Sequence, residues 1–315
     1  MKKRWILIPV VALFVVGLLI GSFFDLQINS AIYDRTNRFG LMFAAFGETP
    51  VYAFMGTIGF GFVMLTKDYK KWWQRVILIT LGVAALAICT YFQGKHIFDV
   101  NGFYNTSRAA KLMGYGAGLI IGLLGACAGY FLFVDMTISP KQLLYILVFI
   151  ALVIGVATGI NQLTKIFMSR PRFRFLANND IIASSFKNWW ESGKSVRDSW
   201  VGQTDAVTGL VITKEEFKSF PSGHMTNTMS LIAILPMLPI INSHIKIKQE
   251  IMVVIAVVWN LILAFTRMLV GAHFLTDVSM GALFTVIIAY VLNEIFLHFY
   301  KKIEEPVQVE EQLAE

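Results

Sequence analysis

Long apolar runs separated by short polar segments dominate the sequence. A helix that crosses about 30 Å of hydrocarbon needs roughly 20 apolar residues. The stretch 28–46 mixes charged and apolar residues, which is typical of an interfacial helix. Eight runs approach or exceed the spanning length: 5–24, 49–65, 73–93, 109–134, 142–163, 222–241, 250–269 and 276–300. The pattern therefore predicts an all-α, polytopic transmembrane helix bundle of about eight spans.

The composition decides the class of protein. Hydrophobic residues make up 56% of the 315-residue chain and charged residues 15%, against about 45–50% and about 25% in soluble domains. Such a chain is not disordered, and it is not typical of a soluble enzyme. The net charge of +7 first indicates basic cytoplasmic loops in a membrane protein, and we expect no nucleic-acid partner.

Basic residues in the short loops predict the orientation. They follow the runs 49–65, 222–241 and 276–300 and also precede the first run, so eight spans place these clusters on one side. The positive-inside rule makes that side the cytoplasm. No small-x-small cleavage site follows Phe24, so we expect an uncleaved anchor rather than a signal peptide. We therefore expect a multi-pass protein of the cell membrane with both termini cytoplasmic and an acidic, solvated tail at 301–315.

Three short segments place charge at the ends of apolar runs, where charge is costly and usually faces a polar cavity. The first segment, at the end of the run 142–163, contains four cations within ten residues: Lys165, Arg170, Arg172 and Arg174. These side chains either snorkel from the helix end or bind an anion. Their position on the predicted external side is contrary to the positive-inside rule, and this favours the interpretation that they bind an anion.

The second segment is Pro-Ser-Gly-His at 221–224, where another run begins. Ser222 is a good N-cap, and Gly223 lets the backbone approach a ligand. First-turn N–H groups together with the positive end of the helix dipole are typical of an anion site. An ordinary capped helix start is the alternative interpretation, but His224 adds a titratable proton donor beside the anion.

The third segment joins the last two runs and contains Arg267, His273 and Asp277. Residues at i and i+4 share a helical face, so Asp277 is expected to lie against His273. A carboxylate that holds one imidazole nitrogen leaves the other nitrogen available for attack. Arg267 offers a planar fork that suits phosphate. The pattern predicts a nucleophilic histidine beside a phosphate site.

All three segments reach the same, external face in the predicted topology. The sequence shows no cluster with metal-ligand spacing, and we expect neither a metal nor a cofactor. His244 and His298 fall on the cytoplasmic side, away from this face. His96, Lys95 and Arg108 fall on the external side, where they could line the rim of the site, but we expect them to be solvated loop residues.

These segments resemble the three-part signature of the type 2 phosphatidic acid phosphatase superfamily, which also includes vanadium haloperoxidases and acid phosphatases. The first part, Lys, six residues and Arg-Pro, is matched by Lys165 and Arg172, with Phe173 in place of the proline. Pro-Ser-Gly-His is matched in full. The last part, Ser-Arg, five residues, His, three residues and Asp, is matched except that Thr266 replaces the serine. The resemblance covers roughly residues 165–300.

The resemblance implies a role for each matched residue. His273 is expected to attack phosphorus and carry the phosphoryl group, Asp277 to orient it, and His224 to protonate the leaving oxygen. The phosphate oxygens are expected to be held by a set of five residues: Lys165, Arg172, Ser222, Gly223 and Arg267. It also implies a six-helix core, so that eight spans would include two extra ones.

The chain is thus expected to have three parts. Residues 1–163 form N-terminal transmembrane helices with the interfacial segment 28–46. Residues 164–300 form the catalytic region, with an external loop at 164–221 and three transmembrane helices, and 301–315 form the tail. We expect a metal-independent lipid phosphatase whose substrate is undecaprenyl pyrophosphate, phosphatidylglycerophosphate or phosphatidic acid. A lipid phosphotransferase and a non-enzymatic phosphate-selective transporter remain as alternatives.

Overall fold

The computed structural model describes residues 7–98 and 107–314. Within these ranges there is no β-strand beyond an isolated bridge between Thr204 and Val211. The same ranges contain eight helical segments long and apolar enough to cross a membrane, which confirms the all-α polytopic bundle. They are α1 (Leu7–Ile32), α2 (Arg38–Phe46) with α3 (Thr49–Leu65), α4 (Trp72–Phe98), α5 (Arg108–Val134), α6 (Pro140–Met168), the broken segment that begins with α10, α13 (Gln249–Leu269) and α14 (Leu275–Ala314).

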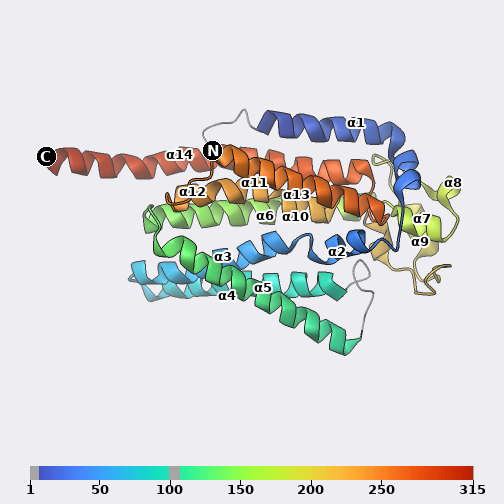
Figure 1. Ribbon diagram of the computed structural model, residues 1–315, viewed down its shortest axis with the longest axis horizontal. Helices are drawn as coiled ribbons and strands as arrows, with labels where there is room; N and C mark the ends of the chain where they lie inside the picture. The colour runs from blue at the N-terminus through green and yellow to red at the C-terminus, as the bar shows by residue number, and fades with distance from the viewer. Residues whose placement is uncertain (1–6, 99–106, 315) are drawn as a thin grey trace.

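Helices α3, α4 and α5 pack on one another and form one side of the bundle (Figure 1). Small residues allow this close approach, as they commonly do between helices in lipid. A Cβ atom on Gly125 would lie 1.9 Å from the carbonyl oxygen of Ala53, so the α3–α5 contact requires glycine there. The Thr57 hydroxyl donates to the Gly125 carbonyl at 2.7 Å across the same contact. The other side consists of α1, α6, α13 and α14, with the α10 segment packed between α6, α13 and α14.

The segment 28–46, which we expected to form one interfacial helix, is divided in the structure. Residues up to Ile32 continue α1, a turn follows, and α2 begins at Arg38 with Asn37 as its N-cap. Helix α2 packs against α13 and α4, and Phe43, Ala44 and Ala45 are buried. The apolar face of α2 therefore lies inside the bundle, where it contacts residues of the candidate site described below.

The sixth predicted span is broken into short pieces: α10 (Gly223–Met229), α11 (Leu231–Ile234), the 3-10 turn η4 (Leu235–Met237) and α12 (Leu238–Ile241). Pro236 and Pro239 lie at the starts of η4 and α12, and proline cannot donate the backbone hydrogen bond that a continuous helix needs. Buried Asn260 of α13 supports the segment, because its side-chain amide donates to the Thr228 carbonyl at 3.2 Å.

Residues 169–222 cover one end of the bundle, which we call the capped end (Figure 1). They include α7 (Phe173–Asn178), α8 (Ile182–Ser185), α9 (Lys194–Trp200) and the turn η3 (Lys214–Phe217). This cap has an apolar core of its own, formed by Phe173, Phe175, Leu176, Val196, Ile212, Phe217 and Phe274. Helix α14 extends beyond the bundle at the opposite end, so the cap and the far end of α14 mark opposite ends of the molecule.

Candidate active site

The structure brings the three predicted segments together at the capped end. Lys165 lies in the last turn of α6, Ser222 is the N-cap of α10, and Arg267 lies in the last turn of α13. The Ser222 backbone N–H donates to the Asp277 carbonyl at 2.9 Å, and the His273 N–H donates to the Arg267 carbonyl at 3.3 Å. The ends of α6 and α13 and the starts of α10 and α14 thus meet around one point.

His273 is held with one ring nitrogen committed to the protein. Its Nδ1 lies 2.7 Å from the carbonyl oxygen of Ser219, and a carbonyl can only accept, so Nδ1 carries the proton and Nε2 keeps its lone pair. The Asn29 side chain fixes the main chain by donating to the His273 carbonyl at 3.1 Å. Burial, opposed by Asp277 and assisted by the charges of Lys165 and Arg172, lowers the pKa of the His273 imidazole to about 3. The imidazole is therefore neutral near pH 7, as a nucleophile must be.

The i, i+4 spacing predicted that Asp277 holds His273 directly, but in the structure it does not. Its Oδ2 lies 3.8 Å from His273 Nδ1, beyond hydrogen-bonding distance. The same oxygen accepts from the Ser219 hydroxyl and from the Phe274 backbone N–H. Asp277 thus fixes Ser219 and the loop before α14, and Ser219 in turn positions His273.

Arg170 is a residue of the candidate site that the sequence analysis did not assign. Its side chain is almost wholly buried, and its two terminal nitrogens contact Asp277 Oδ1 at 2.6 Å and Asp25 Oδ2 at 2.9 Å. The guanidinium also lies over the Phe274 ring, 4.2 Å from its centroid. The sequence signal was Asp25, a carboxylate directly after the first apolar run, because a charge beside hydrocarbon requires a partner.

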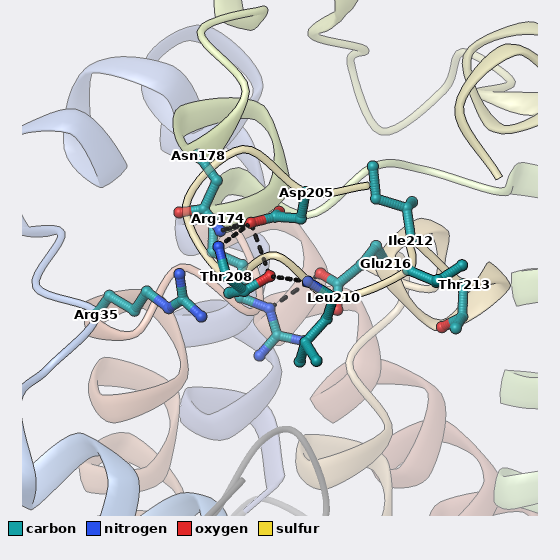
Figure 2. Close-up of a pocket in the computed structure, with 10 residues that line it drawn as sticks. Arg35, Arg174, Asn178, Asp205, Thr208, Leu210, Ile212, Thr213 and Glu216 are labelled. Atoms are coloured by element: carbon teal, nitrogen blue, oxygen red, sulfur yellow. Dashed lines mark hydrogen bonds and ion pairs between the residues drawn. The ribbon is translucent and has the colours of Figure 1, made fainter. Parts of the chain in front are cut away.

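Arg174 is likewise paired with a carboxylate. It donates to both oxygens of Glu216, at 3.0 and 2.7 Å. Burial raises the pKa of Glu216, but Arg174 and Arg172 outweigh it and hold that pKa below its usual 4.5. Figure 2 shows this pair beside Arg35 and Asp205 on the wall of a cavity of about 70 Å³ in the cap. Arg170 and Arg174 are therefore buried ion-pair residues rather than snorkelling cations.

Lys165 and Arg172 are the other two cations of the first segment. Lys165 Nζ donates to the Lys218 carbonyl at 3.2 Å, and the Arg172 backbone N–H donates to the Glu216 carbonyl at 2.8 Å. Both side chains are buried, and the charges of both act on His273. A Cβ atom on Gly223 would lie 3.4 Å from Lys165 Nζ, so glycine leaves room between this ammonium and the start of α10.

Ser222 and His224, both at the start of α10, contact different parts of the protein. The Ser222 hydroxyl caps α10 by accepting from the Met225 N–H. His224, the second residue of α10, lies with Nε2 3.4 Å from the Ala44 carbonyl and 3.9 Å from Glu48 Oε2. Arg267, His96 and His273 are its charged or titratable neighbours. The second predicted histidine thus faces helices α2 to α4 as well as the site.

The expectation that His96 is a solvated loop residue is wrong. It lies near the end of α4, where its Nε2 contacts Glu48 Oε2 at 3.0 Å and its ring meets that of His224 edge-on at 5.0 Å. Lys95 and Arg108 are exposed, as expected. Sequence reasoning missed Glu48 and His96 because each lies at the end of a different apolar run, and only the packing of α3 on α4 places them together.

Comparison with known proteins identifies one family. The model described as the PAP2 superfamily matches residues 143–301, just over half of the chain. The matched region begins in α6 and contains all three segments of the site. No curated protein and no solved structure matches the chain.

Proposed function

The chain belongs to the PAP2 superfamily and is a membrane protein of the phosphatase type, and we propose that it hydrolyses a lipid phosphate or pyrophosphate through a phosphohistidine intermediate. One observation carries the proposal. His273 commits Nδ1 to the Ser219 carbonyl at 2.7 Å and keeps Nε2 for attack, while the buried cations Lys165 and Arg172 act on it.

The proposed reaction has two steps. First, His273 Nε2 forms a bond to phosphorus as the bond from phosphorus to the leaving oxygen breaks, and His224 gives that oxygen a proton. Second, His224 takes a proton from water, the water oxygen attacks phosphorus, and the N–P bond breaks to release phosphate and neutral His273. Such covalent catalysis divides one difficult displacement into two easier ones.

The remaining predicted site residues would hold the phosphate oxygens. Phosphoryl transfer depends mainly on positioning and on stabilisation of the charge on the equatorial oxygens. Lys165, Arg172 and Arg267 would supply positive charge, and Ser222 and Gly223 would offer the start of α10. Asp277 and Ser219 contribute by positioning His273 rather than by contact with the substrate. Three cations provide the charge that a divalent metal provides elsewhere, so the reaction would not need one.

A lipid is the substrate class that best fits the location of the site. The site lies where membrane-crossing helices end at the cap, so a headgroup could reach it while the tail stays in the bilayer. We propose that the capped end faces the outside of the cell membrane and that both termini are cytoplasmic, in line with the basic loops. Undecaprenyl pyrophosphate, phosphatidylglycerophosphate and phosphatidic acid are the candidates, with the first ranked highest.

The test is phosphate release by purified protein from a panel of these three lipids, with EDTA present. We expect turnover of at least one lipid, no loss of rate in EDTA, and inhibition by vanadate, which adopts a five-coordinate geometry like that of the transition state. A rate lost on chelation and restored by a divalent cation would overturn the mechanism. Transfer of the phosphoryl group to an added alcohol without phosphate release would instead identify a phosphotransferase.

A further inference from the structure

Three titratable residues form a group beside the site, and only one of them, His224, takes part in the proposed reaction. Glu48 is the residue immediately before α3, His96 lies near the end of α4, and His224 lies in α10. His96 Nε2 and His224 Nε2 lie 3.0 and 3.9 Å from the same carboxylate oxygen, Glu48 Oε2. Three helices thus direct two imidazole nitrogens and one carboxylate oxygen toward one point.

The spacing of these three atoms suits a metal ion. Zinc bonds to histidine nitrogen and carboxylate oxygen are about 2.0–2.2 Å long, so neighbouring ligand atoms of a tetrahedral site lie about 3.3 Å apart. The two distances to Glu48 Oε2 bracket that value, and the three atoms all lie within 4.8 Å of one another.

The carboxylate is held in position by residues outside the trio. The Asn227 amide donates to Glu48 Oε1 at 2.9 Å, and the Tyr52 hydroxyl donates to Oε2 at 3.2 Å. Only 3% of Glu48 is exposed. Partners of this kind orient the ligands of metal sites and are part of their affinity. The ring of Tyr52 is also stacked on His96, which restricts the second ligand.

The donor set also selects the kind of ion. Two imidazoles and one carboxylate suit zinc and its neighbours cobalt and nickel, whereas magnesium and calcium prefer oxygen ligands alone. Zinc with three protein ligands keeps a fourth position for water. One carboxylate neutralises half of the ion's charge, so an additional anion in the fourth position would be favoured.

We propose that Glu48, His96 and His224 form a binding site for Zn²⁺ or a similar transition-metal ion, and that the bound ion stops turnover. The second part rests on the proposed function of His224. An imidazole whose Nε2 is bound to metal cannot become imidazolium, so it cannot exchange a proton with the leaving oxygen and then with water.

The binding test uses the full-length protein in detergent, first stripped with EDTA and then freed of chelator. Co²⁺ is titrated as a spectroscopic probe and Zn²⁺ by calorimetry. We expect one ion per chain in the wild type and at least tenfold weaker binding in His96→Asn. His244→Asn is the matched control, since it removes an exposed histidine from the loop between α12 and α13. Equal affinity in the wild type and His96→Asn, or no binding by the wild type, would overturn the site.

Two further measurements keep the proposal decisive. Glu48→Gln preserves the side-chain volume and the acceptor for Asn227, so it tests the site if His96→Asn fails to fold, and it should also weaken binding at least tenfold. In the phosphatase assay, Zn²⁺ should inhibit the wild type and His244→Asn but not His96→Asn at the same concentration. Inhibition that persists in a His96→Asn protein without bound ion would refute the inhibitory role. If no lipid phosphate is hydrolysed, the proposed function fails, whereas the Co²⁺ spectrum still decides the site.

Discussion

Replacement of Arg170 by methionine tests the network that holds the catalytic loop. Arg170 is 1% exposed, and its terminal nitrogens bridge Asp25 and Asp277. Methionine fills much of the same space without charge. Two carboxylates would then remain buried with no cation between them, and Asp277 would lose the contact that fixes its Oδ1.

The loss of stability expected for Arg170→Met depends on the hydrogen bonds that each carboxylate retains. Removal of one partner from a buried ion pair costs about 3–5 kcal/mol. Asp25 retains the Thr276 N–H at 3.0 Å and its hydroxyl, and Asp277 retains the Phe274 N–H at 2.8 Å and the Ser219 hydroxyl. We therefore expect a loss near the lower limit, about 3 kcal/mol, rather than twice the cost of one pair.

Two comparison variants separate charge balance from loss of packing. Asp25→Asn keeps the shape of the side chain and leaves Arg170 on Asp277, so it should cost about 1–3 kcal/mol, the range for one charged hydrogen bond. Because the neutral amide of Asp25→Asn relieves the repulsion between the two carboxylates, the double variant should be more stable than the sum of the two single losses implies. Arg75→Met is the matched control, since exposed Arg75 donates at the surface to the Tyr69 carbonyl at 2.7 Å, and surface substitutions of this kind usually change stability by no more than about 0.5 kcal/mol.

The assay combines thermal unfolding in detergent with kcat and KM on one lipid phosphate. In Arg170→Met we expect a lower kcat with little change in KM at temperatures where the protein is folded, because Arg170 acts through Asp277 and Ser219 on His273. Asp25→Asn should retain most of its turnover. An Arg170→Met protein within about 0.5 kcal/mol of wild type, the range of neutral surface changes, would refute the network as a source of stability. A normal kcat would refute its positioning role.

Three other predictions concern the nucleophile, the cap and the orientation. His273→Ala should remain folded and lose several orders of magnitude in kcat, and residual activity above about one tenth of wild type, a cost under about 1.4 kcal/mol, would exclude it as nucleophile. The pKa of Glu216 is lowered in the folded protein, so its pair with Arg174 contributes its full stability above the usual pKa of 4.5 and loses it as the pH falls through the lowered value. The melting temperature of Glu216→Gln should therefore fall less with acid than that of the wild type. In a chain without its native cysteines, a cysteine at Trp200 should react with an impermeant thiol reagent in whole cells and one in the tail 301–315 should not, whereas labelling of the tail alone would invert the orientation.

The apolar pattern predicted the spans well, and it did so because span length is a local property. The short second span, 49–65, corresponds to α3 (Thr49–Leu65). The three motif segments were also placed correctly at one end, since the number of crossings between them fixes which ends meet. The cap could not be predicted: its core forms between residues such as Phe175 and Phe217 that are far apart in sequence.

The sequence could not tell which charges neutralise one another. Four cations in the first segment looked equivalent, yet Arg170 and Arg174 are paired with carboxylates from other elements. Asp25 is 145 residues from Arg170, and no periodicity relates them. The same reason explains Asp277: its spacing from His273 is correct, but the tertiary structure places the Ser219 carbonyl nearer to the imidazole.

The N-terminal helices complete the candidate site rather than only accompany it. The family match covers residues 143–301, but the carbonyl of His273 is held by Asn29 of α1, and Arg170 is held in part by Asp25 of the same helix. Glu48, at the start of α3, faces His224. The expected boundary at residue 163 therefore separates residues that contact one another in the structure. We therefore expect substitutions in α1 that keep its apolar surface but remove these polar contacts to alter the surroundings of His273.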